Sequence, residues 1–210
     1  MAYSYNKSYL PDAMNNLADA FDTAASLYKF KLDYFLKLFI ISGIASQFEI
    51  GNPKYVVGKS GVELVADVVS KTNAADIIIP KSPYKESTEE YWTGWVLAYY
   101  QWCTNKRFRD IQKIISMEEL KGKYNPYHEM DEQKLVDYIN SKSDVSNRIK
   151  RLQAYRKALG LSQSQLANES GINLRTLQQY EIGAKDLDKA SASTVLALSK
   201  TLKCDIEDLI

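Results

Sequence analysis

The sequence is poor in the residue types that build metal, redox and disulfide sites. It contains one histidine, His128, and two cysteines, Cys103 and Cys204, among 210 residues. The cysteines lie far apart and fit neither a metal-ligand nor a redox spacing, so we expect two buried thiols. A single histidine excludes a multi-histidine metal site. We therefore predict no bound metal and no cofactor.

No combination of residues typical of catalysis is apparent either. His128 stands close to three acidic residues, which leaves a catalytic or metal-binding role open, but a helix cap, a turn or a core hydrogen bond is the favoured interpretation. Gly58-Lys59-Ser60 resembles the end of a phosphate-binding loop. That pattern needs a glycine five residues earlier, where the chain has Pro53, so a helix-entry turn is favoured. We predict that the protein is not an enzyme.

Long apolar runs and a large net charge are also missing. The most apolar stretch, residues 34–45, is interrupted by Lys37 and is too short to span a bilayer. The N-terminus lacks the charged start and apolar run of a secretory signal, so we expect a cytoplasmic protein that makes no membrane contact. The net charge is +1, and residues 144–210 hold ten Lys or Arg against eight Asp or Glu. Charge alone therefore does not identify a nucleic-acid-binding protein.

Apolar residues at helical spacing are present along most of the chain, which predicts a mainly α fold. We expect helices over residues 11–29 and 31–48. Capping boxes predict two further helix starts, at Ser60-Gly61-Val62-Glu63 and at Ser87-Thr88-Glu89-Glu90. The run Ile77-Ile78-Ile79 predicts either one short strand or a buried extended segment.

The helix after the second capping box is the most aromatic part of the chain. Four aromatic residues recur at spacings of three, four and three and form one stripe: Trp92, Trp95, Tyr99 and Trp102. Such a stripe is typical of a core-facing side. Tyr91 and Tyr100 fall outside the stripe and are candidates for a pocket or a partner surface.

Residues 162–183 are the most informative segment for function, because they predict two short helices joined by a tight turn. Ser162 and Gln165 form a capping box, Gly171 permits a turn with positive φ, and Asn173 caps the second helix. The inward-facing residues are Leu166, Ala167, Ile172, Leu177 and Tyr180. The outward-facing residues are Leu174, Arg175, Thr176, Gln178 and Gln179. Arginine and glutamine side chains pair well with base edges in the major groove of DNA.

This segment lies within residues 146–210, which resemble the lambda-repressor/Cro-type helix-turn-helix, often called the Xre family. Residues 151–163 are similar to the first helix of the family and the entry to its second helix. Leu166-Ala167, Gly171, Leu177, Tyr180-Glu181 and Gly183 fall at the spacing of the family, and residues 196–209 resemble its closing helices. The resemblance implies a five-helix DNA-binding domain, although such a fold can also serve only to bind protein.

The resemblance also implies roles for single residues. Gln163 matches a position that contacts phosphate and braces the recognition helix. Asn173 matches a phosphate-contacting cap, and Lys185 lies in the loop where the family often touches the DNA backbone. Arg156 and Glu181 match a structural ion pair. The base-facing positions are Leu174, Arg175 and Gln179, with Thr176 and Gln178 as helpers.

Two features depart from the family pattern. Leu174 is apolar where many relatives carry a polar residue, so it either contacts a thymine methyl group or packs. The loop at residues 184–193 is longer than usual by about four residues. It contains Lys185 and Lys189 together with Asp186 and Asp188, which offsets its positive charge.

The first part of the chain carries a second resemblance. Gly51-Asn52-Pro53-Lys54-Tyr55, Tyr91-Trp92-Thr93-Gly94-Trp95 and Tyr99-Tyr100-Gln101-Trp102 resemble a domain that accompanies an Xre-type helix-turn-helix in bacterial regulators beside small toxin-like genes. No chemistry of these motifs is implied.

These patterns give a domain prediction and a functional hypothesis. We predict a helical partner-binding or dimerisation domain at residues 1–140, a polar linker at 141–145 and a DNA-binding domain at 146–210. The favoured function is a homodimeric repressor that binds a double-stranded DNA operator as the antitoxin of a toxin–antitoxin module, with the cognate toxin as a partner. The alternative is a repressor whose N-terminal domain binds a small molecule.

Overall fold

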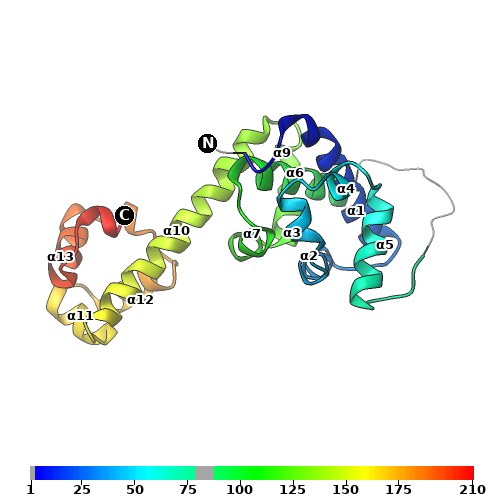
Figure 1. Cartoon of the computed structure of the whole chain (residues 1–210). Coiled ribbons are helices and arrows are strands. Elements are labelled where there is room, and N and C mark those ends of the chain that lie inside the picture. Colours follow the sequence, from blue (N-terminus) through cyan, green and yellow to red (C-terminus); the bar gives the residue numbers. More distant parts are fainter. Residues whose placement is uncertain (1–2, 79–87) are drawn as a thin grey trace. The chain divides into compact units, whose positions relative to one another are not determined.

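The computed structural model describes residues 3–78 and 88–210, apart from the side chains of residues 144–148 and 150. The chain divides into two compact units, Met1–Asp137 and Tyr138–Ile210. The described residues contain helices and no strand, so the prediction of a mainly α fold is confirmed (Figure 1). In the same residues, no helix is long and apolar enough to span a membrane.

The N-terminal unit is built from short helices that surround a longer pair, α1 and α6. After a 3-10 turn, η1 (Lys7–Tyr9), come α1 (Leu10–Ser26), α2 (Leu32–Ile41), α3 (Ile44–Glu49), α4 (Pro53–Val56), α5 (Gly61–Thr72), α6 (Glu89–Thr104), α7 (Phe108–Ile114), α8 (Met117–Lys121) and α9 (Tyr124–Tyr127).

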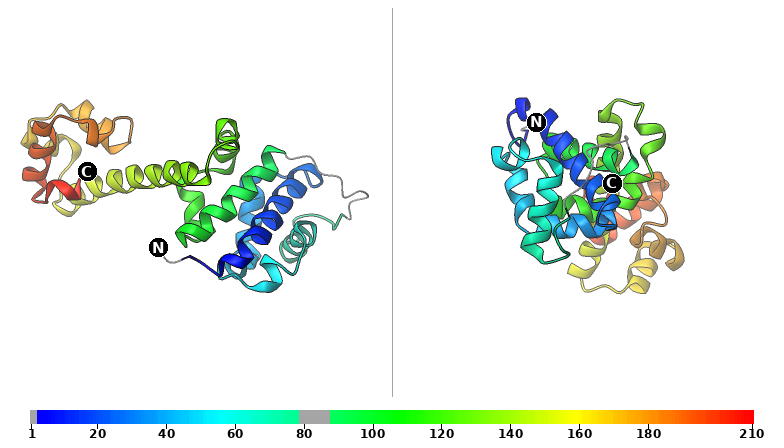
Figure 2. Two further views of the ribbon diagram at one scale, coloured as in Figure 1. Left: turned by 90° about the horizontal axis from the view of Figure 1, so that it is seen from above. Right: turned by 90° about the vertical axis from the view of Figure 1, so that its right-hand side faces the viewer.

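Helices α1 and α6 lie side by side at the centre of this unit (Figure 2). Gly94 permits their close approach, because a Cβ atom there would come within 2.5 Å of the Leu17 carbonyl oxygen and 2.8 Å of the Ala18 Cα. The α6 face that carries Gly94 is therefore the buried one, and Val96, Leu97 and Tyr100 are buried as well.

The prediction that the whole aromatic stripe faces the core is therefore wrong. Only Trp102 of the stripe is buried, whereas Trp92, Trp95 and Tyr99 are half-buried. The physical reason is that backbone-to-backbone contact with α1 requires small residues, so the bulky side chains are turned away from α1. Tyr100, which falls outside the stripe, is 1% exposed and belongs to the core.

Other sequence predictions for this unit need smaller corrections. The helix expected over residues 31–48 is broken at Gly43, where φ is +76°, and continues as α3. Helix α6 is capped by Thr88, whose hydroxyl accepts a hydrogen bond from the Tyr91 N–H, and Ser87 lies outside the described residues. Ile77 and Ile78 form neither a strand nor a buried segment, because they are 57% and 40% exposed. Ile79 lies outside the described residues.

The capping box at Ser60 and Glu63 is confirmed. Of the two expected buried thiols, Cys103 is buried, and burial raises its pKa to about 11. Cys204 is only half-buried.

The C-terminal unit contains most of α10 (Glu132–Ala158), followed by α11 (Gln163–Ser170), α12 (Leu174–Glu181), η2 (Leu187–Lys189), α13 (Ala192–Leu202) and η3 (Ile206–Asp208). The polar segment 141–145, expected as a linker, lies inside α10. The core of the unit is apolar and draws on every one of its helices up to α13: Leu152, Leu166, Ala167, Leu177, Tyr180, Leu187, Val195, Leu198, Leu202 and Leu209.

Candidate nucleic-acid interface

Local hydrogen bonds fix the start of both helices of the predicted motif. The Ser162 hydroxyl accepts a hydrogen bond from the Gln165 N–H at 3.2 Å, and the Gln165 side chain accepts one from the Ser162 N–H at 2.8 Å. This is a complete capping box. Asn173 accepts hydrogen bonds from the N–H groups of Arg175 and Thr176 at 2.9 and 3.4 Å, so it caps α12 as expected.

The turn between the two helices depends on Gly171, which has φ of +69°. A side chain there would meet no neighbouring atom within 4 Å, so glycine is needed for its backbone conformation and not for space. Beyond the turn, Leu177 and Tyr180 are buried three residues apart on α12. They anchor one face of α12 against the core and leave the other face outside.

A buried ion pair joins the end of α10 to the end of α12. The Arg156 guanidinium donates to both carboxylate oxygens of Glu181, from Nε at 2.6 Å and from Nη2 at 3.0 Å, and its Nη1 donates to the Leu161 carbonyl at 2.8 Å. The side chains of Arg156 and Glu181 are 11% and 1% exposed. A two-point contact in this setting fixes the angle of α12 as well as its position.

Burial alone raises the pKa of the Glu181 carboxyl. Hydrogen bonds from Arg156 and Gln163 and the charge of Arg156 outweigh that effect, so the net pKa is below the usual 4.5. Glu181 is therefore ionised at neutral pH and holds both donors in place.

The outer face of α12 is polar and accessible. Arg175 and Gln178 are exposed, and Thr176 and Gln179 are half-buried at the edge of the same face. Arg175 and Gln179 form no side-chain hydrogen bond or ion pair with the residues that the structure describes. Their donor groups are thus available to base edges. Leu174, at the start of the helix, is 37% exposed, so it is not a core residue.

Gln163 connects the two helices of the motif. Its amide donates to Glu181 Oε2 at 2.7 Å, and its carbonyl oxygen lies 3.5 Å from the Gln178 amide nitrogen, which is the donor. The side chain is half-buried. Its visible role is therefore to brace α12, and a phosphate contact remains a prediction.

The loop after α12 is folded back by an apolar anchor. Leu187 in η2 is buried, and the Lys185 N–H donates to the Gln179 carbonyl at 3.1 Å. The Lys185 side chain is exposed beside the end of α12, whereas Lys189 lies 4.0 Å from the Asp186 carboxylate. Lys185 is thus the better placed of the two lysines for a phosphate contact.

Part of the C-terminal unit matches a known protein family. Residues 152–209 match the HTH_3 family, described as Helix-turn-helix. The C-terminal unit contains a helix-turn-helix domain. The match supports a lambda-repressor/Cro-type domain and a DNA-binding transcriptional regulator. Comparisons with curated proteins and with solved structures gave no match.

The helix-turn-helix domain contains one contact that the sequence did not predict. The Gln153 amide on α10 donates to the backbone carbonyl of Glu181 at 2.6 Å. It satisfies a carbonyl group at the C-terminal end of α12, where helical partners are missing. Gln153 is half-buried and polar, so no sequence pattern marks it as a structural residue.

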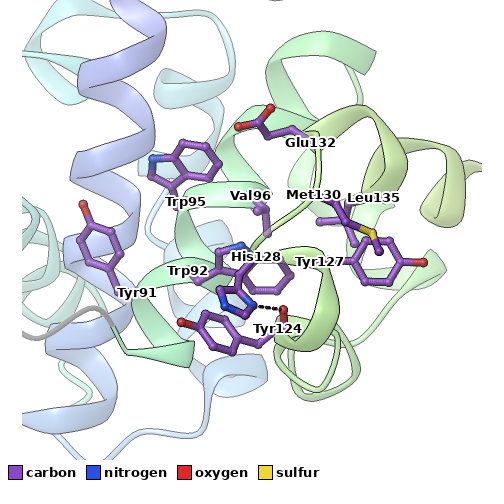
Figure 3. A pocket seen from close by; sticks show the side chains of 10 residues that line it. All are labelled: Tyr91, Trp92, Trp95, Val96, Tyr124, Tyr127, His128, Met130, Glu132 and Leu135. Carbon is purple, nitrogen blue, oxygen red and sulfur yellow. Dashed lines mark hydrogen bonds between the residues drawn. The ribbon is translucent and has the colours of Figure 1, made fainter.

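Outside the matched residues, the N-terminal unit contains a pocket of about 380 Å³ between α6, α9 and the first turn of α10 (Figure 3). His128 is one of its lining residues. Its ring stacks on Tyr124 at 4.2 Å, its Nδ1 lies 2.9 Å from the Tyr124 carbonyl oxygen, and its Nε2 lies 3.6 Å from a Glu129 carboxylate oxygen. Among the described residues, no group of three or more potential metal ligands is found. The turn-stabilising interpretation of His128 therefore fits its contacts.

Proposed function

We propose that the protein is a sequence-specific repressor that binds a double-stranded operator through α12, acting as the antitoxin and autorepressor of a toxin–antitoxin module. The observation that carries the DNA-binding part is the polar face of α12, on which Arg175 and Gln179 are accessible and unpaired among the described residues. Base contacts by these side chains supply specificity, and phosphate contacts from Gln163, Asn173 and Lys185 set the register.

Homodimerisation is part of this proposal. Residues 144–210 carry an excess of only two basic residues, so one domain neutralises few phosphates and binds weakly. Two domains on half-sites roughly one helical turn apart double these contacts and read a palindrome. The N-terminal unit is then available to join protomers or to bind the toxin, since exposed aromatic side chains are effective interface anchors.

A gel-shift titration of the full-length protein on the DNA upstream of its own gene tests operator binding. We expect a complex that survives an excess of scrambled competitor DNA, contains two protomers per operator, and weakens steeply as salt rises. Equal affinity for the operator and the scrambled DNA would contradict sequence-specific repression.

The antitoxin part needs a separate experiment. Co-expression with the product of the adjacent open reading frame should give a stable complex and relieve growth inhibition by that product. If neither complex nor relief is found while operator binding persists, the protein is a repressor and not an antitoxin.

A repressor that senses a small molecule is the second candidate. The pocket beside α6 favours it, because its volume of about 380 Å³ lies within the range of ligand sites, roughly 300–1,000 Å³. Thermal-shift screening of the full-length protein, followed by gel shifts with any stabilising compound, distinguishes this function from the first.

A further inference from the structure

The pocket of the N-terminal unit has an unusual lining. Five half-buried aromatic side chains surround it from two directions, Tyr91, Trp92 and Trp95 from α6 and Tyr124 and Tyr127 from α9 (Figure 3). Among the lining residues that the structure describes, Glu132 is the only carboxylate and none is a lysine or arginine. Such a lining offers π faces and one negative charge to a ligand.

The aromatic walls are held in place by contacts of their own. The Tyr91 hydroxyl donates to the Asn15 side-chain oxygen at 3.2 Å. The Tyr124 ring meets Trp92 edge-on, with a centroid distance of 5.6 Å and an interplanar angle of 85°, and it stacks on His128. A ligand therefore finds preformed walls and loses little affinity to the ordering of side chains.

Glu132 is the second, independent observation. It is half-buried in the first turn of α10, and it forms no hydrogen bond or ion pair with any described residue. A partly desolvated carboxylate without a partner favours a ligand that brings a positive charge or donors. Burial and the Cys103 thiol raise the pKa of nearby Tyr99, and the carboxylates of Glu132 and Asp131 raise it further.

We propose that this pocket binds a small organic cation, with the cationic group against the face of Trp95 and its charge balanced by Glu132 (Figure 3). Aromatic faces attract cations through their quadrupoles, and the attraction grows where water is excluded. Phosphorylated or carboxylated ligands are disfavoured, since the described lining residues include no lysine or arginine to balance their charge. The proposal extends the second candidate function by naming a ligand class.

Choline and its uncharged counterpart 3,3-dimethylbutan-1-ol separate the effect of charge from that of shape, because they differ chiefly in one atom, nitrogen against carbon. Titrations of the full-length protein are followed by calorimetry and by tryptophan fluorescence. Of the three tryptophans in the chain, Trp92 and Trp95 line the pocket and Trp102 does not. We expect saturable choline binding with a dissociation constant below about 1 mM, and affinity for the alcohol weaker by about tenfold or more.

Two variants locate the site. Glu132→Gln keeps the shape and removes the charge, so it should weaken choline binding by about five- to tenfold and leave the alcohol unaffected. Trp95→Ala should weaken choline binding by a similar factor, and Trp95→Phe by less, because phenylalanine retains a π face. Asp137→Asn is the matched control, since it removes an exposed carboxylate from the same helix outside the pocket and should change nothing.

Equal affinity for choline and the alcohol would overturn the proposal, as would an unchanged choline affinity in Glu132→Gln. Absence of saturable binding by both choline and tetramethylammonium up to about 10 mM would also overturn it. None of these measurements involves DNA, so their failure leaves the proposed operator binding intact, and failure of operator binding leaves the pocket intact.

Discussion

Helices α6 and α12 carry exposed side chains in their respective units, and they differ in what determines the buried face. On α12, Leu177 and Tyr180 are the buried apolar residues, and the rest of the helix is polar apart from Leu174 at its start, so hydrophobicity indicates the buried face. On α6, bulky apolar residues surround the whole helix. There the close approach of α1 to Gly94 determines the buried face, and four aromatic side chains of the helix stay half-buried. An amphipathic pattern thus identifies the buried face only where the opposite face is polar.

A glutamate that packing shields from water has a lowered pKa in the C-terminal unit and a raised pKa in the N-terminal unit. Glu181 faces a guanidinium, and its pKa is lowered because charge-assisted hydrogen bonds outweigh burial. Glu49 accepts a 2.7 Å hydrogen bond from the Phe108 N–H, but burial dominates and its pKa is raised. Ionic pairing therefore stabilises the position of α12, whereas Glu49 contributes a hydrogen bond to the Phe108 N–H and no ion pair among the described residues.

The largest expected effect is the loss of stability when the Arg156–Glu181 ion pair is broken. Arg156→Ala leaves the Glu181 carboxylate buried without its counter-charge, and loss of one partner of such a pair costs about 3–5 kcal/mol. Hydrogen-exchange mass spectrometry on peptides from α11 and α12 should show this loss of protection, while peptides from α1 and α6 remain unchanged. Arg175→Ala is the control, because that arginine is exposed and should alter stability little. A loss below about 1 kcal/mol would mean that the pair contributes only orientation.

The next largest effect concerns the close contact between α1 and α6 in the N-terminal unit. Gly94→Ala places a methyl group 2.5 Å from the Leu17 carbonyl oxygen, so α1 and α6 must separate, at a cost of about 3 kcal/mol. Urea unfolding followed by tryptophan fluorescence reports on this unit, since all three tryptophans belong to it. Gly122→Ala is the matched control: φ is −63° and the nearest contact is 3.5 Å, so it should be neutral or slightly stabilising. Equal stabilities of the two variants would show that the helices separate easily.

A smaller effect concerns the function of the α12 face. Arg175→Ala and Gln179→Ala should each weaken specific operator binding by about 1–3 kcal/mol and leave scrambled DNA less affected. Gln163→Ala should weaken both DNAs more evenly and should also loosen α12, because its bond to Glu181 is lost. Arg109→Ala removes the same charge from an exposed site of the N-terminal unit and serves as the control. Unchanged gel shifts in both α12 variants would show that this helix does not recognise the operator sequence.

The smallest effect is an opposite pH response of the two units. The lowered pKa of Glu181 means that its stabilisation is present above pH 4.5 and is lost as the pH falls through the folded-state value. The raised pKa of Glu49 gives the reverse, since its destabilising effect appears as the pH rises above 4.5. Exchange rates measured between pH 6 and 3.5 for the parent chain, Glu181→Gln and Glu49→Gln isolate each contribution. Contributions of the same sign would contradict the assigned causes.

The helix-turn-helix could be predicted closely because its signals are local. Ser162 with Gln165, Gly171 and Asn173 act within a few residues along the chain, and the structure shows each in its expected backbone role. The contact of Gln153 with Glu181 was missed, because it joins two helices and leaves no periodic pattern in the sequence.

For this protein, the sequence by itself determined the helical class, the caps and turn of the helix-turn-helix, and the outward polar face of α12, since these depend on neighbours within one or two turns of helix. Only the tertiary structure decided which side of α6 is buried and that Glu132, unpaired among the described residues, lines the same pocket as Trp92 and Trp95. These outcomes depend on how closely segments distant in sequence can approach one another. That distance is set by the size of the residues between them, as the missing Cβ of Gly94 shows, and not by a pattern along a single helix.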